Sequence, residues 1–130
     1  DLDRTFWEIL STDHLQLLRN SYAYAAAPVG GHPITVSGPG IIDVTMFRQT
    51  QSITVHLVNL TNPMFLRGPV REITPVGPQR VTVRLPAGQS VLKVQLLTYQ
   101  QPVQYVKSGS SHIVEVPEIA IHEIIAFEIQ

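Results

Sequence analysis

The residues best suited to chemistry gather in one proline-rich stretch, 59–79. Its four prolines and two glycines rule out a continuous strand, yet it holds too many apolar residues for a solvated linker. Arg67, Arg71 and Glu72 could bind sugar hydroxyls or a protein partner, because guanidinium forks and carboxylates form hydrogen bonds of defined geometry. The simpler interpretation is a packed connection in which Arg71 and Glu72 pair or face water.

Two tyrosines form a second candidate site. Tyr99 and Tyr105 flank a polar run that contains Gln100, Gln101 and Gln104. Aromatic rings commonly stack on the apolar face of a sugar, so this pattern is typical of a sugar-binding surface with a polar rim. The favoured alternative is that both tyrosines are strand-end residues that hold a hairpin corner.

Most catalytic chemistry is disfavoured by the residue types present. The chain has no cysteine, which excludes a disulfide, a thiolate metal site and a cysteine nucleophile. His122-Glu123 does not begin a zinc-binding His-Glu-x-x-His motif, because Ala126 stands where the second histidine would be. We therefore expect no catalytic residue, no metal and no cofactor. Four glutamates near the C-terminus are expected on solvated strand faces: Glu115, Glu118, Glu123 and Glu128.

The charge pattern argues against nucleic acid and membranes as partners. Nine basic and ten acidic residues give a formal net charge of -1, without a long run of either sign. No stretch approaches the roughly 20 apolar residues that span a bilayer. The first residues lack the basic start and apolar core of a signal peptide. We expect a soluble chain and leave its compartment open.

The apolar pattern predicts a mainly β fold. Apolar residues make up 44% of the chain and charged residues 15%, and the apolar ones are mostly Val, Ile and Leu. Residues 80–85 alternate between valine or leucine and polar side chains, as in a strand with one solvated face. The spacing predicts an antiparallel β-sandwich of about seven or eight strands. The predicted strands are 34–37, 41–48, 52–60, 80–85, 91–99, 103–107, 112–116 and 120–129.

The first 28 residues differ from the rest. Ser11 offers a helix-capping oxygen, and apolar residues then recur at helical spacing until Pro28. This predicts one N-terminal helix over about 13–26. Two prolines and two glycines between 28 and 33 predict a linker or domain boundary.

Several stretches carry a resemblance to a known family. They are 3–7, 15–20, 55–63, 68–78 and 114–117, together with His122-Glu123, and 68–78 is the most specific. With these stretches the chain resembles the C-terminal end of a group of bacterial glycoside hydrolases. In that group a (β/α)8 barrel is followed by a flavodoxin-like domain, of the β-galactosidase-trimerisation or glutamine-amidotransferase type, and then by a β-sandwich.

The resemblance implies a division into two parts. Residues 1–28 would end the flavodoxin-like domain, with 3–7 and 15–20 as its last strand-to-helix passage, and 29–130 would form the β-sandwich. The family's catalytic acid and nucleophile belong to the barrel, and no position of this sequence matches them. The implied role is a non-catalytic accessory domain that packs on, stabilises or helps to assemble the rest of its enzyme, including any homo-oligomer.

Two other functions remain open. The first is a carbohydrate-binding module that uses the arginines and tyrosines named above. The second, an independent hydrolase, would need two carboxylates roughly 5–10 Å apart in an open cleft, and we do not expect them.

Overall fold

The computed structural model describes residues 2–9, 11–61 and 72–130, and the chain divides into two compact units, Asp1–Pro33 and Ile34–Gln130. The origin of residues 1–28 in a flavodoxin-like domain stays a prediction. No helix in the described part of the chain is long and apolar enough to cross a membrane.

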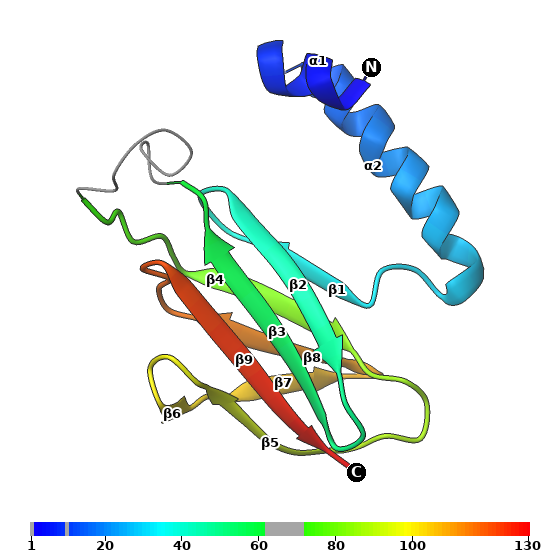
Figure 1. Cartoon of the computed structure of the whole chain (residues 1–130). Helices are drawn as coiled ribbons and strands as arrows, with labels where there is room; N and C mark the ends of the chain where they lie inside the picture. The colour runs from blue at the N-terminus through cyan, green and yellow to red at the C-terminus, as the bar shows by residue number, and fades with distance from the viewer. Residues whose placement is uncertain (1, 10, 62–71) are drawn as a thin grey trace. The chain divides into compact units, whose positions relative to one another are not determined.

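The N-terminal unit is helical (Figure 1). The predicted helix is confirmed as α2 (Thr12–Ala26), which the side chain of Ser11 caps by accepting the N–H of His14 at 3.4 Å. A 3-10 turn, η1 (Ala27–Val29), follows it. Residues 3–7, which the resemblance likened to part of a strand-to-helix passage, belong to a second helix, α1 (Leu2–Ile9), which the sequence did not predict. An ion pair one turn apart, between Arg4 and Glu8 at 2.7 Å, favours the helix over a strand.

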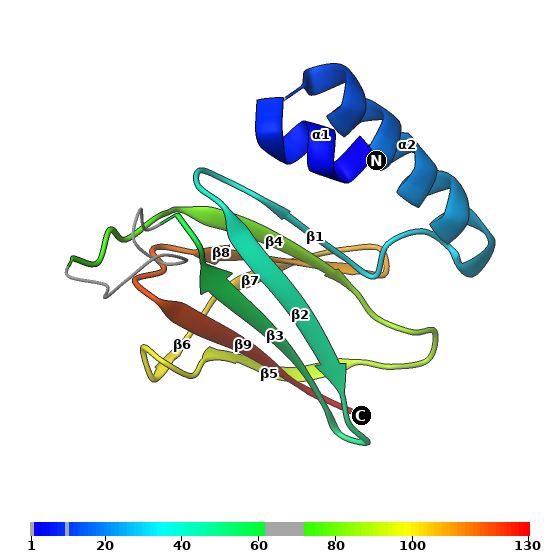
Figure 2. The same cartoon turned by 45° about the horizontal axis from the view of Figure 1, so that its top comes forward.

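The second unit is an antiparallel β-sandwich, as predicted. Its layers are a four-stranded sheet in the order β1-β4-β8-β7 and a five-stranded sheet in the order β2-β3-β9-β5-β6 (Figures 1 and 2). The four-stranded sheet contains β1 (Ile34–Ser37), β4 (Gln79–Arg84), β8 (Ser111–Val116) and β7 (Tyr105–Ser108). The five-stranded sheet contains β2 (Ile42–Arg48), β3 (Ser52–Asn59), β9 (His122–Ile129), β5 (Val91–Leu96) and β6 (Gln101–Pro102). The sequence did not predict β6, which is only two residues long.

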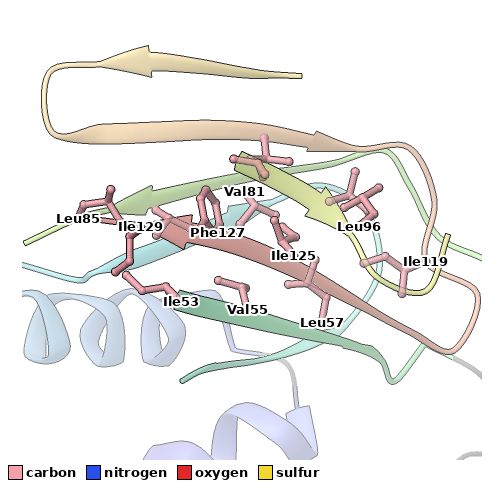
Figure 3. Close-up of a cluster of buried hydrophobic side chains, with 14 of the residues drawn as sticks. Ile53, Val55, Leu57, Val81, Leu85, Leu96, Ile119, Ile125, Phe127 and Ile129 are labelled. Atoms are coloured by element: carbon pink, nitrogen blue, oxygen red, sulfur yellow. The ribbon is translucent and has the colours of Figure 1, made fainter. Parts of the chain in front are cut away.

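The core lies between the two sheets. Every second residue of β3 and β9 points inward and is fully buried, as Figure 3 shows for Ile53, Val55, Ile125 and Phe127. Valines of β4 and β8 meet them from the other sheet. Because burial of each such side chain contributes about 1.5–3 kcal/mol, this inward row holds the two layers together.

β3 and β9 are the central strands of the five-stranded sheet. β3 pairs with β2 on one side and β9 on the other, and β9 pairs with β3 and β5. Residues 52–60 were therefore rightly predicted to form a central strand. Their outward side chains, however, are only half-buried, so this strand has an inner face and a partly exposed outer face.

Candidate functional site

The predicted arginine site can be followed only in part. Arg67 and Arg71 lie outside the described residues. Glu72 is described and is exposed. A sugar-binding or partner-binding role for these three residues stays a prediction.

Of the two predicted tyrosines, Tyr105 lies in a strand and Tyr99 in a turn. Tyr99 lies in the turn after β5, is 39% exposed, and donates a hydrogen bond from its hydroxyl to Oε1 of Glu118 at 3.3 Å. Partial burial, together with the charge and hydrogen bond of Glu118, raises the pKa of Tyr99 above its ordinary value. Tyr105 begins β7, is half-buried against the core, and has its ring 5.3 Å from that of His112. The prediction that Tyr99 and Tyr105 bind a ligand is not tested and stays a prediction.

Glu123 does not lie on a solvated face, and that prediction was wrong. Its side chain is fully buried. Oε1 accepts the N–H of Thr98 at 2.9 Å and that of Ile124 at 2.7 Å, and Oε2 accepts the N–H of Tyr99 at 3.3 Å. The carboxylate therefore fastens the turn after β5 to strand β9, because its oxygens accept backbone N–H groups from both.

The other three glutamates, Glu115, Glu118 and Glu128, are exposed as predicted. The paired carboxylates of a glycosidase both face an open cleft, where one donates a proton and the other attacks or activates water. Glu123 cannot be half of such a pair, since its oxygens are buried and bonded to the backbone.

Asn59 is a second buried structural side chain. The sequence Asn59-Leu60-Thr61 fits the pattern for N-glycosylation. In the structure the amide of Asn59 is fully buried, where Nδ2 donates to the carbonyl of Thr74 at 2.8 Å and that of Ala120 at 3.0 Å. Asn59 therefore ties β3 to two later segments of the chain and is closed to a glycan in the folded state.

The outer face of the five-stranded sheet carries a cluster of three rings, Phe47, His56 and His122, which the sequence did not reveal. The Phe47 ring meets the His56 ring edge-on, with centroids 5.2 Å apart. The His56 and His122 rings stack at 5.3 Å, and Nδ1 of His56 lies 3.2 Å from Nε2 of His122. In the described part of the chain, no group of three or more His, Asp or Glu side chains is placed to hold a metal ion, so we assign no metal to this pair.

Strand register explains how these rings meet. β2, β3 and β9 run side by side, with Thr45 opposite His56 and His56 opposite Ile124. Directly opposed residues point to the same face, and diagonal neighbours lie within reach of aromatic side chains. Phe47 on β2 and His122 on β9 are the diagonal neighbours of His56, so one histidine in the central strand brings the three rings together.

A hollow of 190 Å³ lies on the same outer face; we call it the Ala126 hollow. Ala126 pairs with Thr54 of β3 on one side and Gln95 of β5 on the other, and all three side chains point outward. Because alanine has only a methyl group, the surface dips between its larger neighbours. The hollow is lined by Ser52, Lys93, Gln95, Ala126, Phe127 and Glu128.

A smaller pocket of 110 Å³ lies near the loop between β4 and β5. His112 lines it and is only 4% exposed. Burial, and then the positive charge of Lys107, lowers the pKa of His112 below its ordinary value. The folded state therefore favours the neutral form of His112.

Comparisons with known proteins give the fold. No protein-family model matches the sequence, and no curated protein matches it. Among solved structures, α-L-fucosidase isoenzyme 2 from Paenibacillus thiaminolyticus is similar, with a TM-score of 0.63 and 19% sequence identity. The match covers 75% of this chain and 15% of the fucosidase chain. The matched part of this chain therefore has the fold of a small segment of a glycoside hydrolase.

Proposed function

We propose that the β-sandwich, residues 34–130, is a non-catalytic accessory domain of a larger glycoside hydrolase-like protein and acts in packing or assembly. The observation that carries this proposal is the fold similarity to a segment that makes up 15% of an α-L-fucosidase. A segment of that size is one domain within a much longer enzyme.

The use of the buried polar groups supports an accessory role. Asn59, Gln79 and Glu123 are buried, and each bonds to the backbone of another segment. Gln79, for example, donates from Nε2 to the carbonyl of Pro39 at 2.6 Å. These side chains hold loops and strands in place, whereas catalytic side chains would be aimed into a cleft.

Deletion of the sandwich from a longer enzyme that contains this sequence tests the proposal. We expect the shortened enzyme to have a lower melting temperature or a changed oligomeric state. Unchanged stability, assembly and activity would contradict the proposal. The 130-residue chain alone should not hydrolyse aryl glycosides, and turnover by the purified chain would also contradict it.

Carbohydrate binding is the second candidate function. Phe47 favours this function, because its aromatic side chain is 53% exposed on β2. The neighbouring strand β3 carries hydrogen-bonding side chains on the same face. Exposed rings of this kind stack on sugars. A glycan array probed with the 130-residue chain tests this function, and the absence of any bound glycan would count against it.

A further inference from the structure

We propose that the outer face of the five-stranded sheet binds a short neutral saccharide, with one sugar ring in the Ala126 hollow and the ring two units further along against Phe47. This inference rests on the second candidate function and assigns it a site other than Tyr99 and Tyr105. The site runs across strands β2, β3, β9 and β5, which are neighbours in this order (Figure 1). The short strand β6 lies beyond β5 at the edge of the sheet.

One row of outward residues crosses these four strands. Phe47 is opposite Thr54, Thr54 is opposite Ala126, and Ala126 is opposite Gln95. Neighbouring strands are about 4.8 Å apart, so Phe47 and Ala126 lie roughly 10 Å from each other across the sheet. This separation is close to the end-to-end length of two linked sugar rings, so the centres of adjacent rings lie only about half as far apart. The row therefore places an aromatic ring and a hollow at a spacing that suits the first and third units of one saccharide.

The charges around the hollow favour a neutral ligand. Lys93 and Glu128 are opposed in register, and Ser52 is opposite Glu128 on the other side. One ammonium and one carboxylate leave no net local charge, so an ion of either sign would face a like charge as well as an opposite one. A sugar hydroxyl both donates and accepts, and it can bond to Lys93, Glu128 and the Gln95 amide alike.

The size of the hollow favours a single sugar ring. Its 190 Å³ is smaller than the roughly 300–1,000 Å³ of pockets that take drug-sized ligands. Ala126 forms an apolar floor, while hydrogen-bonding side chains form the rim. Sugars have the same division, with apolar C–H faces and polar hydroxyl edges.

Phe47 is held in place before any ligand arrives. The edge-on contact with His56 restricts its ring, and the bond between His56 and His122 restricts His56 in turn. Because a restrained side chain loses less entropy on binding, this arrangement lowers the cost of stacking a sugar on the exposed part of the ring.

Calorimetric titration of the 130-residue chain tests the site. The probes are three neutral saccharides, 2′-fucosyllactose, lactose and maltotriose, each raised to about 10 mM, which detects binding in the millimolar range. We expect at least one to bind. Phe47→Ala should weaken that binding about tenfold, which corresponds to about 1.4 kcal/mol, because it removes the aromatic face on which the sugar stacks. Ala126→Phe should abolish it by filling the hollow.

Matched controls separate the site from its rivals. Val106→Ala removes an exposed side chain from β7 of the other sheet and should leave binding unchanged. Tyr99→Ala should also leave it unchanged. Gln95→Ala offers a second loss-of-binding variant, and circular dichroism confirms that each variant is folded.

Two results would overturn the inference. If none of the three saccharides binds, the outer face is not a saccharide site, while the accessory role is still judged separately by deletion of the sandwich. If a saccharide binds and Tyr99→Ala abolishes binding while Phe47→Ala does not, carbohydrate binding stands and the proposed site is wrong.

Discussion

The two faces of the five-stranded sheet differ although the same strands form both. On β9 the inward residues Ile125 and Phe127 are fully buried, whereas the outward residues between and beside them include Ala126 and Glu128. The buried residues of the inner face are apolar apart from Asn59 and Glu123, and the outer face mixes rings, small residues and charges. Because side chains alternate along a strand, one segment stabilises the fold with one face and presents a different set of side chains on the other.

The largest expected effect contrasts two phenylalanines. Phe127→Ala on the inner face should lower the free energy of unfolding by about 3–5 kcal/mol, because it leaves a cavity in the core. Phe47→Ala makes the same chemical change on the outer face and should cost no more than about 1.5 kcal/mol, mainly from the lost edge-on contact with His56. Urea denaturation measures both values. Equal losses would show that the two faces do not differ in their contribution to stability.

A pair of glutamates on β9 sharpens the comparison. Glu123→Gln should cost about 1.5–3 kcal/mol, because an amide cannot accept all the N–H bonds that the buried carboxylate accepts. Glu128→Gln, which is exposed, serves as the control and should cost less than about 0.5 kcal/mol. Chemical denaturation at pH 7 compares the two variants. A cost for Glu128→Gln as large as that for Glu123→Gln would contradict the assignment.

The ring cluster should show a smaller, pairwise effect. A double-mutant cycle with Phe47→Ala and His56→Ala should give a coupling free energy of about 0.5–1.5 kcal/mol, because the two rings meet edge-on. The same cycle with Val106→Ala in place of Phe47→Ala should give no coupling free energy. A coupling near zero for Phe47 and His56 would mean that the ring is not held in place.

The smallest expected effect is a pH dependence due to His112. Its pKa is lowered in the folded state, so the unfolded chain binds the proton more readily. Stability should therefore decrease as the pH falls through about 6.5 toward the lower folded pKa. His112→Gln removes this contribution, and thermal unfolding from pH 8 to pH 5 should show a flatter profile for the variant. Parallel profiles would contradict the account.

The strands could be predicted from the sequence because their patterns are local. Residues 80–85 alternate clearly, and turn residues separate most of the other segments, so each predicted strand appears close to its expected place. The helix α2 was also found, since its cap and spacing are local signals. By contrast, α1 was missed because its stretch was interpreted through a family resemblance and not through the Arg4–Glu8 spacing.

The candidate site could not be predicted, because it depends on strand register. Phe47 and His56 come from consecutive strands and His122 from a strand much further along the chain, and a shift of one residue would turn any of them to the other face. The Ala126 hollow likewise depends on register, because its lining residues come from β3, β9 and β5. The prediction for Glu123 was wrong for a related reason. Two of its hydrogen-bond partners, the N–H groups of Thr98 and Tyr99, lie in a turn that is distant from it in sequence.

Chemical-shift mapping of the 15N-labelled 130-residue chain with 2′-fucosyllactose tests the division between the faces most directly. The predicted result is a set of saturable shifts along the row of Phe47, Thr54 and Ala126, with the amides of Tyr99 and Tyr105 unmoved. Shifts confined to Tyr99 and Tyr105, or no shifts at all, would contradict the proposal that the outer face is the binding surface of this sandwich.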